Sequence, residues 1–160
     1  MSETIKNKKY PQKSMRQSRI EVIQVLYKFI ILEREIDPAV AFEEFDFLNR
    51  TQLEKLDKIA SNYEFIKKMI KINLSSDWSF ERLNPITKAI LINATYELFV
   101  LDKAIVINEA LEIGKMFFDV DNFQAKKNLK FINACLQSIF NALVILEKRN
   151  RKLENSNEEK

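Results

Sequence analysis

The sequence of 160 residues contains one glycine, Gly114, and three prolines, and this scarcity limits the folds open to the chain more than any other property. Hairpin turns favour glycine, and phosphate-binding loops need it where the backbone must approach a ligand closely. A P-loop or a dinucleotide-binding fingerprint is therefore impossible here. Apolar residues make up 46% of the chain, enough for a full core. A chain poor in turn residues but rich in apolar ones is predicted to be all-α.

Histidine is absent, and cysteine occurs once, at Cys135. The commonest general base and metal ligand is therefore missing, and neither an intramolecular disulfide nor a cysteine-rich zinc site can form. We predict no enzymatic activity, no metal and no cofactor. The lone thiol suits a reducing cytoplasm. No apolar run approaches ~18 residues, and the polar, basic N-terminus is unlike a secretory signal, so no membrane-spanning segment is expected.

Apolar residues recur at three- and four-residue steps over most of the chain, as they do on one face of a helix. This pattern predicts helices over about 15–32, 38–47, 51–74, 86–101, 104–118 and 129–149. Asp37 and Asn84 each precede a proline, a pairing typical of a helix start. Thr51 with Glu54 is predicted to form a capping box, and Asn108 to cap the helix that contains it. The helix after Asn84 is apolar on almost every side and should lie at the centre of the fold.

The first nineteen residues are strongly basic, with six cations against Glu3 alone: Lys6, Lys8, Lys9, Lys13, Arg16 and Arg19. A basic arm that leads into a helix is a common electrostatic footprint for a phosphate backbone. A solubilising tail explains the same composition equally well. The net charge of +3 is too small to argue for nucleic acid by itself.

Two carboxylates, Glu109 and Glu112, stand three residues apart on a predicted helix, and Lys115 follows three residues further on. A catalytic or metal-binding pair needs more ligands or a perturbed environment, and no histidine exists to join this pair. We interpret Glu112 and Lys115 as surface or interface charges. Glu109 is interpreted as a structural acid, or as a first-turn acid that favours the helix N-terminus. An active site is not expected here.

Four segments occur in the order seen in one known family: RQSRIEVIQVLY (16–27), RLNPITKAILINATYEL (82–98), VINEALEIGK (106–115) and KFINACL (130–136). In these segments the chain resembles the NusB family of bacterial transcription antitermination factors. The resemblance implies a compact all-α bundle of about six to seven helices, a single domain over 15–150 in two subdomains, about 15–76 and 77–150. A basic flexible arm, 1–14, precedes this domain. A charged tail, 151–160, follows it and is expected to fray.

NusB proteins bind the boxA element of nascent RNA together with NusE, a small-subunit ribosomal protein, and help RNA polymerase to read through terminators, notably in ribosomal RNA operons. The resemblance therefore implies single-stranded boxA-like RNA, NusE and the RNA polymerase antitermination complex as partners, with no DNA and no membrane. It also implies a cytoplasmic location. A protein-only helical adaptor stays open, and so does a stand-alone NusB-like RNA-binding module in ribosomal RNA maturation.

By position, the resemblance assigns six residues to RNA and two to the protein partner. The RNA set is Lys13, Arg16, Arg19, Lys130, Phe131 and Asn133, and the partner set is Tyr27 and Thr87. Aromatic residues at helical spacing usually belong to the core, so the sequence pattern alone favours a core role for Phe131. The residue lies at the edge of the apolar stripe of the last helix, and the resemblance makes base stacking an equal alternative.

Other positions depart from the family or have plain structural interpretations. Ile92 stands where the family usually has arginine, so Glu97 is expected to lack a cationic neighbour. The segment 118–128 is longer than the family's. We interpret Trp78 as a staple for the loop between the subdomains, and Cys135 as a small core residue.

Overall fold

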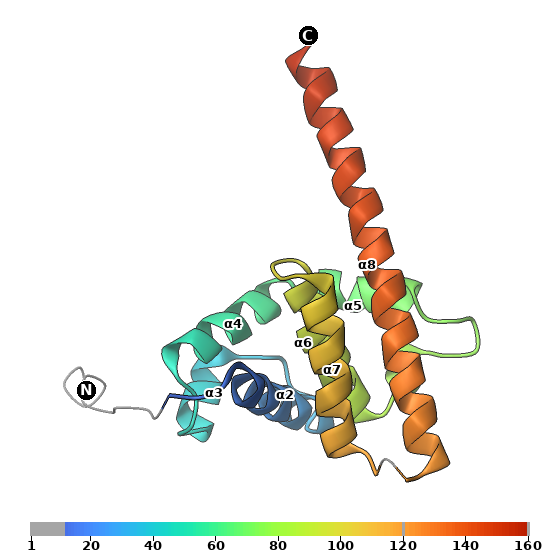
Figure 1. Cartoon of the computed structure of the whole chain (residues 1–160). Helices are drawn as coiled ribbons and strands as arrows, with labels where there is room; N and C mark the ends of the chain where they lie inside the picture. Colours follow the sequence, from blue (N-terminus) through green and yellow to red (C-terminus); the bar gives the residue numbers. More distant parts are fainter. Residues whose placement is uncertain (1–11, 120, 160) are drawn as a thin grey trace, which may run out of the picture.

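Helices account for nearly all regular structure in the computed structural model, which describes residues 12–119 and 121–159 (Figure 1). Their bounds are α2 Met15–Ile31, α3 Pro38–Glu44, α4 Arg50–Ser61, α5 Tyr63–Ile72, α6 Pro85–Leu98, α7 Lys103–Phe117 and α8 Phe123–Glu158, with a 3-10 turn, η1, at Phe80–Arg82. No strand occurs within the described ranges. The predicted all-α fold is confirmed.

Helix α6 occupies the centre of the body, as its apolar sequence predicts. It packs against α2, α4, α5, α7 and α8, and Ile90, Leu91 and Ile92 on three different sides of it are all fully buried. Around it, α2 contributes a row of buried side chains that includes Ile23, and α8 contributes Leu136. A helix that is apolar all round is stable only when other helices cover every side, and α6 meets that condition.

Two of the predicted helix caps are confirmed and two are wrong. Asp37 and Asn84 accept hydrogen bonds from the backbone of α3 and α6, each ahead of a proline at the first helical position. Helix α4 begins earlier than predicted, because Asn49 caps it in a reciprocal capping box with Gln52. Asp102 caps α7, so Asn108 lies inside that helix. Several residues that can cap a helix occur near the starts of α4 and α7, and the capping motif alone does not identify the one that does.

The helix predicted over 51–74 is two helices with a break at Asn62. The Asn62 side chain donates a hydrogen bond to the carbonyl of Lys58 at 2.8 Å, and its backbone leaves the helical region with ψ of 11°. Asparagine competes for backbone groups in this way and often ends a helix. The apolar stripe continues in phase from α4 into α5, so periodicity gives no sign of the break.

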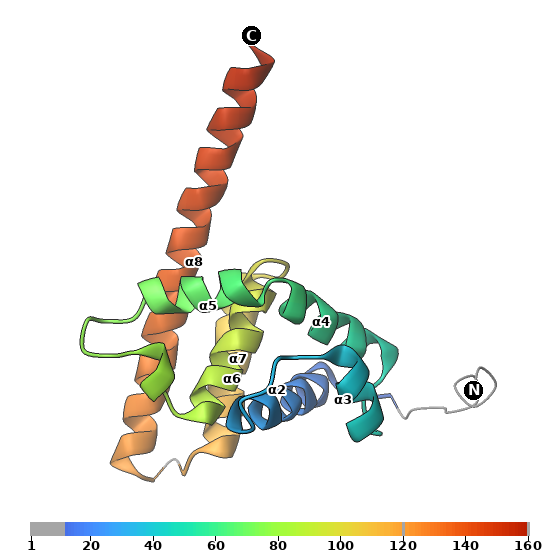
Figure 2. The same ribbon diagram turned by 180° about the vertical axis from the view of Figure 1, so that it is seen from behind.

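Helix α8 is much longer than the predicted 129–149, and the tail expected to fray is helical to Glu158. Asn122 caps its start by accepting a hydrogen bond from Gln124 N. The first half packs on the body, whereas the second half projects beyond it as a single rod (Figures 1 and 2). From residue 145 onward every described side chain is exposed, including Leu153.

Helix α8 is long and apolar enough, by length and composition alone, to cross a membrane. It meets this criterion although it contains no long uninterrupted apolar run. One 18-residue window has a mean hydropathy of 1.6, and 22% of that window is buried. The core helix of a protein without membrane contacts meets the same criterion. Ile132, Leu136 and Ile139 of α8 are fully buried in this core, so packing explains much of the apolar character.

Gly114, the single glycine, lies where α7 and α8 come together. A Cβ atom at this position would stand 2.7 Å from Leu129 Cδ2. Glycine therefore serves close helix packing here and not a turn.

Candidate nucleic-acid interface

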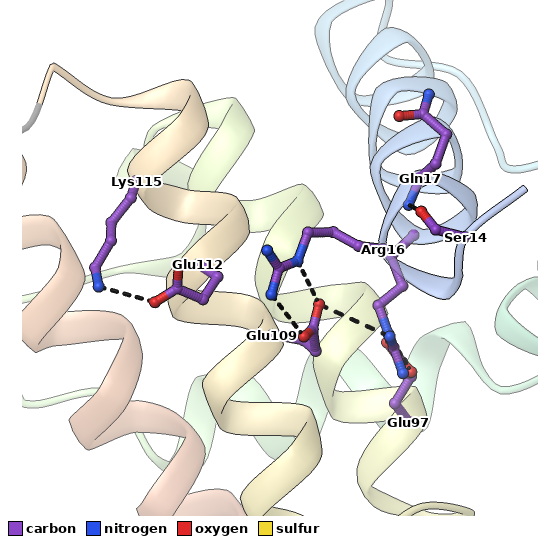
Figure 3. A network of polar contacts seen from close by, with 8 residues as sticks. Ser14, Arg16, Gln17, Glu97, Glu109, Glu112 and Lys115 are labelled. Carbon is purple, nitrogen blue, oxygen red and sulfur yellow. Dashed lines mark hydrogen bonds and ion pairs between the residues drawn. The ribbon is translucent and has the colours of Figure 1, made fainter.

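Arg16 lies in the first turn of α2 and reaches across to α7 (Figure 3). Its Nε and Nη2 donate to the two carboxylate oxygens of Glu109, both at 2.9 Å. The Arg16 hydrogen bond lowers the pKa of Glu109, although desolvation opposes this shift, and the same hydrogen bond raises the pKa of Arg16. The Arg16 side chain remains 45% exposed, so one edge of the guanidinium faces solvent while the other is paired.

Arg19, one turn further along α2, is buried with 6% of its side chain exposed. Its Nε donates to both carboxylate oxygens of Glu97 on α6, at 3.0 and 2.9 Å. Lys55 Nζ of α4 lies 3.4 Å from the same carboxylate, and Asn93 donates to it at 2.8 Å. Burial lowers the pKa of Lys55, and Glu97 opposes that shift.

This cluster corrects two expectations from the sequence. Glu97 was expected to lack a cation because Ile92 replaces the family arginine, yet it has two, Arg19 and Lys55. Arg19 was predicted to contact RNA, but in the structure it holds α2 against α6 and is covered by protein. Three helices meet at one carboxylate, which makes the cluster a structural support for the surface beside it.

Lys13 is also turned inward. Its Nζ donates to Gln52 Oε1 at 2.9 Å and to the carbonyl of Phe47, and it pairs with Glu21 Oε2 at 2.8 Å. Only 11% of the Lys13 side chain is exposed. Gln52 in turn donates to Glu21 at 2.9 Å, so this residue ties the start of α2 to α4 instead of presenting a free charge. The other lysines of the basic arm, Lys6, Lys8 and Lys9, lie outside the described residues.

The predicted RNA residues of α8 occupy two neighbouring faces of that helix. Lys130 and Asn133 are exposed on one face, whereas Phe131 is half-buried on the next and packs against the core. Trp78, from the loop between α5 and η1, lies against Phe131 with ring centroids 5.5 Å apart. Lys126 and Lys127, one turn earlier, are exposed as well. The first turns of α8 thus carry three exposed lysines and Phe131, against which Trp78 of the α5–η1 loop packs.

The two residues predicted to face a protein partner differ in exposure. Tyr27 of α2 is 37% exposed, and Thr87 of α6 is buried at 3%. Tyr27 lines a surface hollow whose remaining wall is formed by Gln24, Asn84, Ile86, Phe117 and Phe118. The hollow is mostly apolar and lies at the start of α6. Thr87 is too deeply buried to form part of its surface.

Glu112 pairs with Lys115 at 2.9 Å on the surface of α7 (Figure 3), as predicted. Glu109 is not a first-turn acid, because α7 starts at Lys103, and it binds Arg16 across the helix interface. The two carboxylates therefore have separate cationic partners. Within residues 12–119 and 121–159, no group of three or more acidic or cysteine side chains is placed to hold a metal ion.

The roles of Glu97 and Lys55 were not predicted from the sequence. A buried glutamate in the most apolar helix is a recognisable signal, because a charge at such a position requires a partner. Nothing in the local sequence identifies Lys55 as that partner, since α4 also contains Arg50 and Lys58. Trp78 was interpreted as a staple for its loop, and its contact with Phe131 agrees with that interpretation, although 48% of the residue is exposed.

The described ranges define a small all-helical protein with exposed lysines on α8 and an apolar hollow beside Tyr27. The family to which it belongs follows from comparison with known proteins. The model of the NusB family matches residues 16–141, which include α2 to α7 and the packed half of α8. The chain belongs to the NusB family.

Several curated relatives named transcription antitermination protein NusB support this membership. The protein of Sulfurimonas denitrificans is 35% identical over 130 residues, which cover 77% of this chain and 93% of the relative. That of Staphylococcus epidermidis is 31% identical over 137 residues, 79% of this chain and 98% of the relative. The Fusobacterium nucleatum protein is 36% identical over 99 residues, but the match spans only 60% of it.

Solved structures agree on the fold. T. maritima NusB superimposes with a TM-score of 0.67 at 24% identity, over 82% of this chain and 93% of that one. A chain from the crystal structure of a plectonemic RNA supercoil gives a TM-score of 0.64 at 24% identity, over 81% and 95%. The family match ends at residue 141, and the fully exposed part of α8 begins shortly after it, at residue 145.

Proposed function

We propose that this chain is an RNA-binding transcription antitermination factor that binds boxA-type RNA together with NusE. In this proposal it acts in the cytoplasm and promotes read-through by RNA polymerase, notably in ribosomal RNA operons. The observation that carries the proposal is the continuous match of residues 16–141 to a family whose curated members are named antitermination proteins. The proposed function includes no enzymatic activity, no cofactor and no DNA partner.

Five of the six proposed RNA residues, all except Phe131, are proposed to have different tasks. Lys130 and Asn133 are exposed and are proposed as direct contacts. Arg16 is proposed to exchange part of its pairing with Glu109 for an RNA phosphate, since its guanidinium is partly exposed. Arg19 and Lys13 are proposed as positioning residues, because both are held by buried carboxylates. Phosphate contacts of this kind fix register, and base contacts give sequence preference.

NusE is proposed to dock at the hollow lined by Tyr27, Ile86 and Phe117. An apolar hollow rimmed by polar groups is the usual form of a protein contact. Thr87 is buried, so its proposed part is to support this surface and not to touch the partner.

The test is a titration with labelled boxA-like RNA and with a scrambled RNA of equal length, each with and without the ribosomal partner. Tighter binding of the boxA-like RNA is expected, and Lys130→Ala with Asn133→Ala should reduce that preference. Lys68→Ala, an exposed lysine on α5, serves as the matched control and should leave it unchanged. Equal affinity for both RNAs under all conditions would contradict the proposal.

A salt series tests the basic arm separately. Log affinity should fall linearly with log salt, by about 0.7 for each single-stranded phosphate that the protein neutralises. A variant lacking residues 2–9 should bind all RNAs less tightly and show a shallower slope. An unchanged slope would make the arm a solubilising tail only.

A protein-only helical adaptor is the second candidate, and one observation favours it. Lys13, Arg16 and Arg19 are all paired with carboxylates of the same chain, which reduces the positive charge presented at the start of α2. If the ribosomal partner binds tightly while neither RNA binds with or without it, this candidate replaces the first.

A further inference from the structure

Trp78, the single tryptophan of the chain, lies on the surface instead of in the core. It is 48% exposed, although tryptophan buries more apolar area than almost any other residue when it can. The loop that carries it reaches out on the side of α8 opposite α7 in both views (Figures 1 and 2). An indole displayed in this way is available to a ligand.

Trp78 is the outer member of an aromatic pair. Its ring lies on Phe131 of α8, with centroids 5.5 Å apart and planes inclined at 42°. Phe131 is half-buried and packs against the core, so it supports the indole from beneath. Of the two rings, the outer one offers the larger open area to a molecule that arrives from solvent.

Exposed lysines of α8 stand close to Phe131, the inner member of this pair. Lys127 precedes Phe131 by one helical turn and Lys130 is its neighbour, and both side chains are exposed. Neither these two nor Lys126 has an ion-pair partner within the described ranges. Asp77 beside Trp78 is the nearest acid in sequence and is exposed. The lysines are therefore free to meet phosphates while the ring meets a base.

An aromatic platform beside unpaired lysines is the arrangement that holds single-stranded nucleic acid, because bases stack on the ring while cations follow the backbone. We propose that Trp78 is a stacking platform for an unpaired base of the RNA bound along α8. This proposal rests on the proposed RNA-binding function. It shifts the base-stacking role from Phe131 to Trp78 and leaves Phe131 as its support.

The single tryptophan makes the proposal directly measurable. Labelled RNA anisotropy reports binding, and the emission of Trp78 reports stacking in the same titration. Tryptophan emission is expected to fall along the binding curve of boxA-like RNA. An abasic ribose-phosphate oligomer should raise the anisotropy without quenching, because it offers phosphates but no ring.

Substitutions separate stacking from stapling of the loop. Trp78→Leu keeps an apolar contact on Phe131 but removes the aromatic face, and it should weaken RNA binding about five- to 150-fold, the range observed for loss of one stacked base. Trp78→Phe should retain most of the affinity. Melting temperatures of both variants show whether the loop is still held in place.

Each outcome decides a different question. Binding without change in Trp78 emission, or wild-type affinity in Trp78→Leu, would overturn the stacking platform and leave the antitermination proposal intact. Absence of any anisotropy change with either RNA, with and without the ribosomal partner, would overturn the RNA-binding function and the platform with it.

Discussion

Arg19 and Glu97 are 78 residues apart in the sequence, yet Arg19 Nε donates to both oxygens of the Glu97 carboxylate. Both side chains are almost fully buried. Asn93 also donates to this carboxylate, and Lys55 Nζ forms an ion pair with it at 3.4 Å. One acidic group therefore holds partners from three helices.

Removal of Glu97 should therefore be among the most destabilising single changes in the protein. Glu97→Ala leaves Arg19 and Lys55 charged without their partner in the interior, and breaking a buried pair in this way costs about 3–5 kcal/mol. Urea unfolding followed by circular dichroism measures the loss. Glu112→Ala removes a surface pair with Lys115 instead and should change the free energy of unfolding by less than about 0.5 kcal/mol. Similar losses in the two variants would contradict the structural role of Glu97.

The Arg16–Glu109 pair should make stability depend on pH. The pKa of Glu109 in the folded protein lies below its ordinary value of 4.5, chiefly because Arg16 donates to it. The ionised carboxylate therefore makes its full contribution to the free energy of unfolding well above pH 4.5. This contribution is lost as the pH falls through the pKa of Glu109 in the folded protein. The difference in unfolding free energy between wild type and Glu109→Gln should narrow from pH 6 to strongly acidic conditions. A difference that stays constant with pH would refute the ion pair.

Gly114 should tolerate a methyl group but not a large side chain. In Gly114→Ala the new Cβ displaces only the end of the half-buried Leu129 side chain, and the gain in helix propensity, about 1 kcal/mol, offsets that shift. Gly114→Ile must separate α7 from α8, and overpacking of this kind costs about 1–3 kcal/mol. Thermal melting of both variants distinguishes them. Equal melting temperatures would show that the two helices are not in close contact.

Cys135 should be unreactive in the folded protein. Burial raises the pKa of its thiol to about 12, so almost no thiolate exists at pH 8, and protein also covers the sulfur. Alkylation with iodoacetamide at pH 8 should be very slow in buffer and rapid in concentrated urea. Fast labelling of the folded chain would place Cys135 at the surface.

The helical class, the central position of α6 and two of the four named caps follow from local sequence. Each depends on neighbours within about four residues, where period and capping rules apply. The break at Asn62 was missed because the apolar stripe runs through it in phase. The length of α8 was missed because the charged residues after 150 have no core to pack on, although their helix propensity is adequate.

The candidate site was less predictable than the fold. From the sequence, Lys13 and Arg19 were interpreted as free cations of a basic arm. In the structure Glu21 neutralises Lys13, and Glu97, which lies on another helix, neutralises Arg19. The charges can be counted in the sequence, but their positions in the folded chain cannot be derived from it. Exposed Lys130 and Asn133 carry no such partner in the described ranges, so their assignment to RNA stays a prediction that the structure permits.

The projecting half of α8 determines how the molecule moves in solution. The fourteen exposed residues from 145 to 158 extend roughly 21 Å past the body at 1.5 Å per residue. A body with such a rod attached rotates faster about the rod than end over end. Nuclear relaxation rates of amides in α8, whose N–H bonds lie along the rod, should therefore differ from those in helices that cross it. The hydrodynamic radius should likewise exceed that of a sphere of 18.9 kDa.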